Sequence, residues 1–312
     1  MRPLLNFAFL LVLVSCQAPL YQDQPTEGSW HIAISPGKLS AALSPESPLL
    51  PLISAHRGGR FLEGLPENSI AAFEYTLSVC PAILEMDISM TKDSVLVLLH
   101  DASLDRTTNG TGKIEDKTWE AIRSLRLKDD FGGLTEHPIP TLEEALRWGK
   151  GKAILSLDVK RGVPFKKVVE WIHATDTRDC VFIITYNPAD AKKVYQLDPK
   201  LMISASLRNT EEIQRMDKTG IPYSNLLAFT GTILSEKTHY QTLRSKGATS
   251  IQGTMGNLDK MAETRGSEIY RNIVGLGAAI LATDRPKKAW EAIQPEQIEK
   301  ANDHFSIRFV TE

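Results

Sequence analysis

The sequence has few cysteines, little net charge and no apolar run long enough to cross a bilayer. Three cysteines occur in 312 residues, and 36 basic side chains nearly balance 38 acidic ones, for a formal net charge of −2. Because nucleic-acid binding usually leaves a basic excess, this balance gives no reason to expect such a partner. With 42% hydrophobic residues, the chain can bury a sizeable core, as one large domain or two average ones.

The amino terminus resembles a bacterial lipoprotein signal. Arg2 is followed by the largely apolar stretch 4–14, too short for a mature transmembrane helix, and then by the letters LVSC ending at Cys16. This pattern predicts cleavage before Cys16 and a lipid anchor on it; an ordinary secretory signal with an incidental cysteine is the alternative. Residues 17–50 are rich in proline and serine and predict a tether. We therefore expect a lipid-anchored protein of the bacterial cell envelope, on the periplasmic side or at the outer membrane.

Two acidic residues alternate with apolar residues in the strand-like segment 82–90. Glu85 and Asp87 are two positions apart, so they point to the same face of a strand. They are hard oxygen ligands suited to Mg²⁺ or Ca²⁺. Such a pair usually lies on a solvated face, but the apolar neighbours predict a buried strand, where unpaired carboxylates are costly. Both interpretations, a solvated face and a metal site, stay open on this segment alone.

Two histidines and an arginine accompany the acidic pair. His56 and Arg57 follow the apolar stretch 51–55, and His100 ends the apolar stretch 95–100. Histidine can move protons near neutral pH, and arginine favours anionic, phosphate-like substrates. Together with the two carboxylates, these residues indicate metal-assisted cleavage of a phosphate ester.

The short link between segments 82–90 and 95–100 predicts a hairpin. Only residues 91–94 lie between them, too few for a parallel crossover. With Lys92-Asp93 as the turn, Asp87 faces Leu98 and Glu85 faces His100, which would place the imidazole beside the acidic pair. This register is a hypothesis, because a slip of one residue would turn the side chains to the other face.

The segment 56–112 resembles the glycerophosphodiester phosphodiesterase family. Weaker matches continue downstream, so the resemblance covers most of the chain after about residue 50. The matching pieces are HRGG (56–59), PENS (66–69), EMD (85–87), TKD (91–93), HD (100–101), LDRTTNGTG (104–112), IPTLEEAL (139–146), LSLDVK (155–160) and ATDRP (282–286).

The resemblance implies a function and a role for each matching residue. It implies hydrolysis of a small-molecule glycerophosphodiester to glycerol phosphate and an alcohol, with one divalent metal ion, Mg²⁺ or Ca²⁺. The nucleophile, water or a hydroxyl of the substrate's glycerol, stays open, as does the division of acid and base between the histidines. The implied residues are His56 and His100 as general acid and base, Arg57 and Lys160 as substrate contacts, Glu85, Asp87 and Asp158 as metal ligands, and Glu67 and Asn68 as supporting residues.

One of these positions departs from the family pattern. The family usually has glutamate where this chain has Asp158, whose side chain is one methylene shorter. Oxygen coordination of a metal ion can absorb such a change by a shift of the ion or a bridging water. The alternative is that Asp158 only forms an ion pair with Lys160 at a strand end.

The rest of the chain alternates strand and helix patterns, which predicts a parallel α/β fold. Nine extended segments are expected, and the family implies that eight of them close into a distorted (β/α)₈ TIM barrel of the phospholipase C-like phosphodiesterase type. This barrel would span residues 51–312, with a small insertion at about 102–140 after the third strand. Site residues would then lie at the carboxyl ends of the strands. Asp284 would end a strand, either holding a histidine or arginine or shaping its loop.

In such a barrel, the remaining two cysteines lie below different strands. Cys80 and Cys180 each come just before a predicted strand. A disulfide requires Cα atoms within about 7 Å, so we expect two free, partly buried thiols. A stabilising bridge is the alternative.

Besides hydrolysis of a soluble glycerophosphodiester, two other functions are compatible with the barrel: cleavage of lipids and non-catalytic ligand binding. Phosphoinositide-specific phospholipases C and sphingomyelinase D-like enzymes act on lipids, which should require exposed apolar loops around the site. The insertion is mostly polar, with Lys128, Asp129 and Asp130, and this favours a soluble substrate. A non-catalytic, ligand-binding surface lipoprotein is the third possibility, and the presence of every expected residue of the early motifs argues against it. The oligomeric state stays open.

Overall fold

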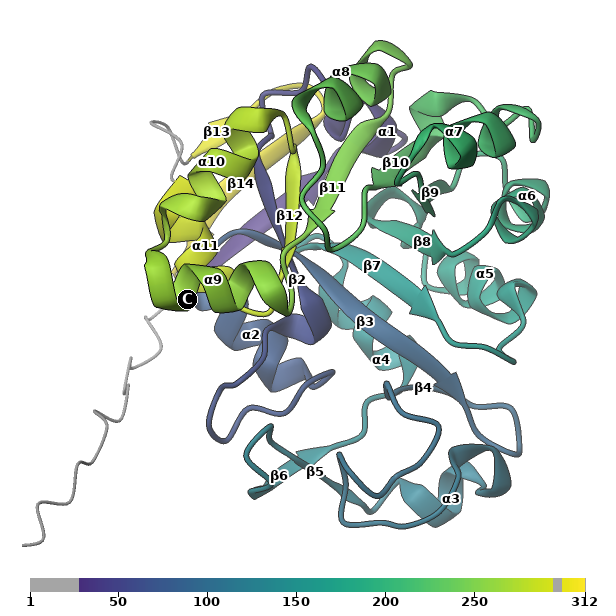
Figure 1. Ribbon diagram of the computed structural model, residues 1–312. Helices are drawn as coiled ribbons and strands as arrows, with labels where there is room; N and C mark the ends of the chain where they lie inside the picture. Colours follow the sequence, from purple (N-terminus) through teal and green to yellow (C-terminus); the bar gives the residue numbers. More distant parts are fainter. Residues whose placement is uncertain (1–27, 294–298, 312) are drawn as a thin grey trace, which may run out of the picture.

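Eight parallel strands form a closed barrel with helices around it (Figure 1). The computed structural model describes residues 28–293 and 299–311, so the predicted signal and Cys16 lie outside the described residues. The barrel closes because β2 pairs with β3 on one side and with β12 on the other. The predicted (β/α)₈ barrel is confirmed. In barrel order the strands are β2 (Leu52–Ala55), β12 (Ile280–Thr283), β11 (Thr249–Gly253), β10 (Leu226–Phe229), β9 (Met202–Ser206), β8 (Val181–Thr185), β7 (Ile154–Val159) and β3 (Ala82–Met90).

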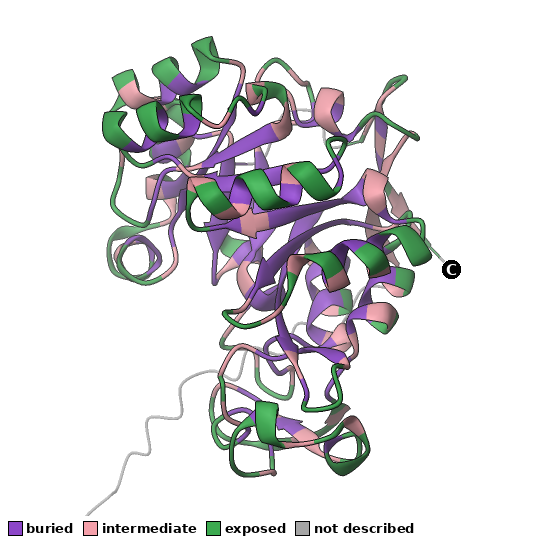
Figure 2. Ribbon diagram, turned by 90° about the vertical axis from the view of Figure 1, so that its right-hand side faces the viewer, coloured by how far each residue is buried: buried purple, intermediate pink, exposed green. Residues whose placement is uncertain are grey.

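The helices expose their outer faces, whereas the barrel strands are buried (Figure 2). Several helices begin where a polar side chain accepts a hydrogen bond from the first turn, as Ser69, Asn187 and Asn209 do. No helix in the described part of the chain is long and apolar enough to cross a membrane. The helices around the barrel are α2 (Ile70–Val79), α4 (Leu142–Gly149), α5 (Phe165–Ala174), α6 (Pro188–Leu197), α7 (Thr210–Asp217), α8 (Lys237–Ser245), α9 (Asn257–Arg265), α10 (Glu268–Leu276) and α11 (Pro286–Ile293), with short 3₁₀ turns η3 (Arg178–Cys180) and η4 (Tyr223–Asn225).

A small antiparallel sheet closes the amino end of the barrel. Strand β1 (Ser29–Ile34) pairs with β14 (Phe305–Val310), which also pairs with β13 (Lys300–Ala301), and helix α1 (Leu39–Ala42) follows β1. Ile32 and Phe305 are buried against the first residues of the barrel strands, such as Leu52 and Ile83. Residues 29–50 are therefore folded, and the tether predicted over 17–50 is wrong for them. Eight of the 22 residues there are proline or serine, and this composition concealed a strand of six residues.

The insertion forms a subdomain with its own apolar core beside β3. It contains η2 (Ile114–Asp116), α3 (Trp119–Ile122) and a hairpin of β5 (Arg126–Lys128) and β6 (Leu134–Pro138). Its buried residues pack against the outer side of β4 (Leu96–Leu98), the strand that pairs antiparallel with β3. The core residues are Val97, Leu99, Leu104, Ile114, Ile122, Leu127 and Ile139.

The hairpin of β3 and β4 is present, but its predicted register is wrong by one residue. Ile88 is opposite Leu98, and the Leu99 N–H donates to the Asp87 carbonyl at 3.0 Å, so Asp87 does not face Leu98. The turn holds three residues because Ser94 has a left-handed conformation with φ 67°, as in three-residue hairpin loops. His100 therefore lies beyond β4 and does not face Glu85.

The two cysteines of the barrel are free, as predicted, and both are buried more completely than expected. Cys80 follows α2 and Cys180 precedes β8, so they lie below different strands. Burial raises the pKa of the Cys180 thiol to about 11 and shifts the pKa of Cys80 further in the same direction. Neither group is poised to be a thiolate at neutral pH.

Candidate active site

Three carboxylates from two adjacent strands meet near the carboxyl end of the barrel. Glu85 and Asp87 lie on β3 and Asp158 lies on β7, where the parallel register places Asp87 opposite Asp158. One oxygen of each lies within 4.8 Å of the others, and all three residues are buried. Burial, followed by repulsion from Asp87 and Asp158, raises the pKa of Glu85. A buried set of three hard oxygen donors fits a divalent cation such as Mg²⁺ or Ca²⁺.

Two cations compensate part of this negative charge. The Lys160 Nζ lies 2.5 Å from Asp87 Oδ1 and 2.6 Å from Asp158 Oδ2. The Arg57 Nε lies 3.3 Å from Asp87 Oδ2, without hydrogen-bond geometry. Burial acts to raise the pKa of Asp87, but Lys160 and Arg57 outweigh it and hold that pKa below its usual value. The ion pair of Lys160 with Asp158 is thus present, and it belongs to the carboxylate cluster through Asp87.

A tight turn after β2 presents His56 and Arg57 to this cluster. The 3₁₀ turn η1 (His56–Gly58) holds Arg57 in a left-handed conformation, φ 55°, and its N–H donates to Glu85 Oε2 at 2.6 Å. Gly58 has φ 83°, and a Cβ there would lie 2.4 Å from the Phe73 ring. The glycine is therefore needed both for the backbone conformation and for the space.

The predicted supporting residues contact the residues they were expected to support. Asn68 donates through Nδ2 to Asp87 Oδ2 at 2.7 Å and accepts from the Asp87 N–H at 2.9 Å. Glu67 accepts from Arg57 Nη1 at 3.0 Å and from both terminal nitrogens of Arg106 at 2.8 and 3.0 Å. Although burial acts to raise it, the pKa of Glu67 is held below its usual value by Arg106 and Arg57. Asn68 has φ 61°, a left-handed conformation that asparagine adopts more readily than most non-glycine residues.

Each histidine is held by an aspartate. Asp284 Oδ1 lies 2.7 Å from His56 Nδ1, and Asp101 Oδ1 lies 2.7 Å from His100 Nδ1. Burial acts to raise the pKa of Asp284, but the His56 hydrogen bond outweighs it and keeps it low, and the hydrogen bond from Arg106 keeps the pKa of Asp101 low. Ionised carboxylates only accept hydrogen bonds, so Nδ1 carries the proton in both histidines. With Nδ1 bonded to an aspartate, Nε2 is the ring nitrogen of each histidine that can exchange a proton with a ligand.

Three residues that sequence reasoning missed complete the site. Arg106 joins Glu67 to Asp101, and through Asp101 it ties His100 to the rest of the cluster. Tyr186, just after β8, donates to Asp158 Oδ1 at 2.8 Å. Asp101 and Arg106 lie inside the motifs at 100–112, so their charged side chains could have been identified as candidate site residues from the sequence. Tyr186 matches no motif, and only its position after a barrel strand could have identified it.

A small pocket of about 130 Å³ opens beside these groups. Its lining includes the charged or polar side chains of His56, Glu85 and Asp158. It also includes the partly or wholly apolar side chains of Tyr186, Phe229, Met255, Ile184 and Ile251. The pocket can therefore hold a small ligand with an anionic end and a less polar end.

A closed parallel barrel carries a carboxylate cluster, an arginine and two histidine–aspartate pairs at its carboxyl end, where barrel enzymes have their active sites. Comparison with known proteins identifies the family. The chain belongs to the glycerophosphoryl diester phosphodiesterase family, whose sequence model matches residues 56–250.

Similar proteins occur among solved structures and curated sequences. A glycerophosphoryl diester phosphodiesterase from Parabacteroides distasonis is 39% identical, with a TM-score of 0.81 over 87% of this chain and 97% of that one. A glycerophosphodiester phosphodiesterase from Caldanaerobacter subterraneus subsp. tengcongensis is 33% identical over 49% of this chain and 65% of its own length. Human glycerophosphodiester phosphodiesterase 1 is 43% identical over 30% of this chain and 28% of its own length. An Oleispira antarctica phosphodiesterase shares the fold, with 18% identity and a TM-score of 0.61 over 79% of this chain and 98% of that one. The chain thus spans less than two thirds of the length of these curated relatives.

Proposed function

We propose that the protein hydrolyses glycerophosphodiesters to glycerol phosphate and an alcohol. The observation that carries this proposal is the meeting of three carboxylates with Arg57 and two aspartate-held histidines at one end of the barrel. The named relatives support it, as does the Oleispira antarctica structure, which contains the product sn-glycerol-3-phosphate. The intact set of charged groups argues against a non-catalytic role.

In this proposal, Glu85, Asp87 and Asp158 hold one divalent ion, Mg²⁺ or Ca²⁺. When bound, the ion would supply a Lewis acid that stabilises charge on the phosphoryl oxygens. Arg57 and Lys160 lie against the same carboxylates and are placed to bind the phosphate oxygens. Tyr186 and Lys160 orient Asp158 by bonding one oxygen each.

The histidines carry the proton transfers. His56 and His100 each present Nε2, because Nδ1 is committed to an aspartate. One accepts a proton from the nucleophile and the other protonates the leaving alcohol. The ionised Asp284 and Asp101 stabilise the imidazolium that forms during each transfer.

The direct test is phosphodiester turnover by the full chain. Glycerophosphocholine should give glycerol phosphate and choline in the presence of Mg²⁺ or Ca²⁺, followed by ³¹P NMR. Chelation with EDTA should stop the reaction and added metal should restore it. Absence of turnover with either metal would overturn the proposal.

We further propose that Cys16 carries a lipid that anchors the protein in the bacterial cell envelope. The support is the apolar stretch 4–14 followed by LVSC. Mass spectrometry of membrane-extracted protein should find an amino-terminal diacylglyceryl-cysteine. A mature terminus at another residue would favour the ordinary secretory signal.

A further inference from the structure

A buried carboxyl group outside the proposed metal cluster lies behind one of the two histidine–aspartate pairs. Asp259 is in the first turn of α9 and is only 3% exposed. Its Oδ2 accepts from the Asp284 N–H at 2.8 Å, and its two oxygens accept from the Thr283 hydroxyl at 2.9 and 3.0 Å. Tyr270, from α10, donates to Oδ1 at 3.0 Å. The carboxyl group is thus bonded directly to the residue that holds His56.

The main chain of Asp284 is fixed on both sides. Its N–H donates to Asp259, and its carbonyl accepts from the Arg60 N–H at 3.0 Å. Asp284 comes directly after β12, beyond the pairing of that strand with β2. With the backbone held in this way, Asp284 Oδ1 lies 2.7 Å from His56 Nδ1. Asp259 therefore supplies the bond that a neighbouring strand would supply within the sheet.

The position of Asp259 is itself set by the neighbouring strands. The Asp259 N–H donates to the Thr254 carbonyl at 2.8 Å. The N–H and the hydroxyl of Thr254 both donate to the Ala282 carbonyl, at 2.7 and 3.1 Å. The first turn of α9 is thereby attached to the end of β12. Asp259 holds Asp284 from a support that is tied to the same strand.

Stability alone is a weak reason for a carboxyl group at this place. Burial raises the pKa of Asp259, and the hydrogen bonds that it accepts only partly offset this effect. A buried carboxyl group is costly unless its hydrogen bonds are made. Apolar side chains of the same shape in place of both partners can be nearly neutral or even stabilising. The network therefore points to a requirement at its other end, which is the orientation of His56.

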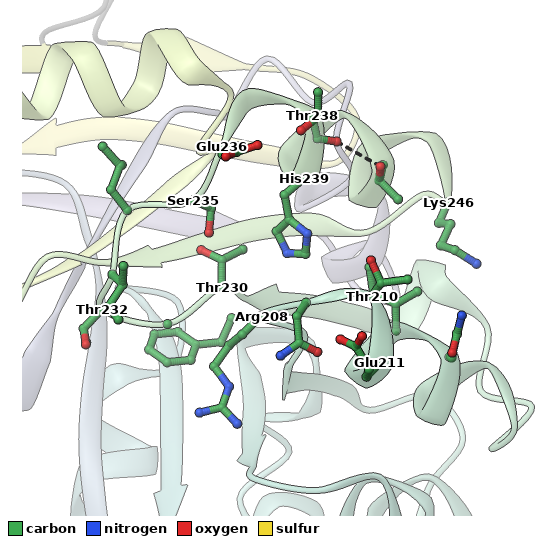
Figure 3. A pocket seen from close by; sticks show the side chains of 18 of the residues that line it. Arg208, Thr210, Glu211, Thr230, Thr232, Ser235, Glu236, Thr238, His239 and Lys246 are labelled. Atoms are coloured by element: carbon green, nitrogen blue, oxygen red, sulfur yellow. Dashed lines mark hydrogen bonds between the residues drawn. The ribbon is translucent and has the colours of Figure 1, made fainter.

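A second buried polar network, on β11, ends elsewhere. Gln252 accepts from the Tyr240 hydroxyl at 2.6 Å and donates to the Gly231 carbonyl at 2.8 Å. The loop that it holds lines a groove of about 860 Å³ between α7 and α8 (Figure 3). Neither histidine of the site is among the described residues that line this groove. Of these two networks, only the one around Asp259 reaches the partner of a site histidine.

We propose that Asp259 is a positioning residue, which holds Asp284 in the orientation that keeps the His56 ring aligned for proton transfer. This inference rests on the proposed function, in which His56 exchanges a proton through Nε2. Within the described part of the chain, the hydrogen bonds of Asp259 reach Asp284 and not His56 itself, so Asp259 acts through Asp284. Misplacement of a reacting group by about 1 Å can cost about 10²-fold in rate.

The test uses two replacements with nearly the shape of aspartate, Asp259→Asn and Asp259→Leu, in the full chain. Asparagine retains an acceptor for the Asp284 N–H, whereas leucine has none. Asp259→Leu should lower kcat for glycerophosphocholine about 10- to 100-fold. KM should stay near the wild-type value, because the groups proposed to bind the phosphate lie on other elements. Asp259→Asn should retain most of kcat.

Asp198→Leu is the matched control. Asp198 is also a buried carboxyl group that bonds a histidine and a backbone N–H, because it accepts from His173 at 2.8 Å and from the Lys200 N–H at 2.9 Å. It lies between α6 and β9, near the amino end of the barrel. Its replacement should lower the melting temperature and leave kcat of the folded protein at the wild-type value.

A measurement without substrate follows the hydrogen bond itself. In protein with ¹⁵N-labelled histidine, the His56 Nδ1 proton bonded to Asp284 should give a downfield ¹H resonance, identified by its loss in His56→Ala. Asp259→Leu should lose this resonance or shift it upfield, and Asp259→Asn should retain it. If Asp259→Leu does not fold, the double variant Asp259→Leu with Tyr270→Phe takes its place, because it removes the buried hydroxyl that would lack an acceptor.

An unchanged kcat or an unchanged His56 resonance in the leucine variant would overturn the inference and leave Asp259 as a structural residue. An equal loss of kcat in Asp198→Leu would also overturn it, because the loss would then follow stability and not position. Wild type that does not turn over glycerophosphocholine would refute the proposed function. The resonance would still decide whether Asp259 holds the pair of His56 and Asp284.

Discussion

At the scale of single residues, the buried charge of the site is divided unequally among the three carboxylates. Lys160 contacts Asp87 and Asp158, whereas the hydrogen bond to Glu85 comes from the Arg57 N–H. Glu85 is therefore the least compensated carboxylate, and burial together with its two acidic neighbours raises its pKa. A divalent ion would supply the missing charge, so metal binding should stabilise the folded protein.

Glu85→Gln should separate stability from metal binding. The amide can still accept from the Arg57 N–H while repulsion from Asp87 and Asp158 is lost, so the variant should melt higher than wild type in EDTA. Wild type should gain about 2.7 kcal/mol when the metal is present at 100 times its dissociation constant, and the variant should gain much less. Thermal unfolding with and without Ca²⁺ or Mg²⁺ measures both effects. Glu115→Gln, at an exposed position of the insertion, is the control and should follow wild type.

His56→Ala and His100→Ala should each lower kcat by about 10² to 10⁴, the usual scale for lost acid–base catalysis. Both side chains are partly exposed at the rim, so the variants should still fold. Steady-state kinetics on glycerophosphocholine measures the loss. His173→Ala, which removes a histidine paired with Asp198 on the helical surface, should keep wild-type kcat. A near-normal kcat for either site variant would remove that histidine from the mechanism.

Asp158→Ala distinguishes a metal ligand from a partner of Lys160. If Asp158 is a ligand, its removal should weaken metal binding and so raise the apparent dissociation constant of the metal. Excess metal should then partly restore turnover. Asp158→Glu should be tolerated, because oxygen coordination absorbs the added length. Titration of metal and measurement of the melting temperature on the same sample give the answer. If Asp158→Ala has an unchanged apparent dissociation constant for the metal but a lower melting temperature, Asp158 only forms an ion pair with Lys160 and is not a ligand.

At the scale of elements, the tip of the β5–β6 hairpin in the insertion is joined to the site through the loop after β2. The Asp130 side chain is almost completely buried, accepts from the Phe61 N–H at 2.6 Å and pairs with Arg60. Arg60 in turn lies 3.4 Å from Glu67, which also holds Arg57. The position of the hairpin tip is thus coupled to the phosphate-contacting side of the site.

Asp130→Ala should loosen this connection. Arg60 loses its main partner and the Phe61 N–H is left unpaired, which should cost about 1–3 kcal/mol of folding stability. Because the loop that carries Arg60 borders the site, KM for glycerophosphocholine should rise more than kcat falls. Kinetics and chemical unfolding on the same protein test both effects. Asp116→Ala, exposed in the same insertion, should change neither quantity, and an unchanged KM in Asp130→Ala would show that the hairpin tip does not shape the site.

Sequence reasoning was accurate for elements with a regular pattern or a motif. It failed where the local backbone conformation or the pairing of strands determines which residues meet. The alternation of strands and helices indicated the barrel, and the motif residues Glu85, Asp87 and Asp158 do meet. The hairpin register failed because the left-handed conformation of Ser94 adds a residue to the turn, and no sequence rule requires it of serine. Strand β1 was missed because its neighbours are rich in proline and serine. Tyr186 was missed because its contact with Asp158 arises only when β7 and β8 pair.

At the scale of the whole molecule, the two ends of the barrel have different tasks. The carboxyl end collects the charged groups and the exposed apolar loops, while β1, β14 and α1 close the amino end with apolar side chains. In such barrels, residues at the amino end contribute mainly to stability. Changes there should therefore alter unfolding without altering catalysis.

Ile32→Ala tests this separation. Ile32 is fully buried between β14 and the barrel, so its truncation should leave a cavity and cost about 2–5 kcal/mol of unfolding free energy. Ile34→Ala, on the same strand but only partly buried, is the matched control and should cost clearly less. Because His56 and the carboxylate cluster lie at the other end of the strands, kcat of the folded fraction should stay at the wild-type value in both variants. Urea unfolding and kcat, measured at a temperature where both variants remain folded, provide the comparison. A loss of kcat in Ile32→Ala without a loss of stability would show that the closing sheet acts on the site itself.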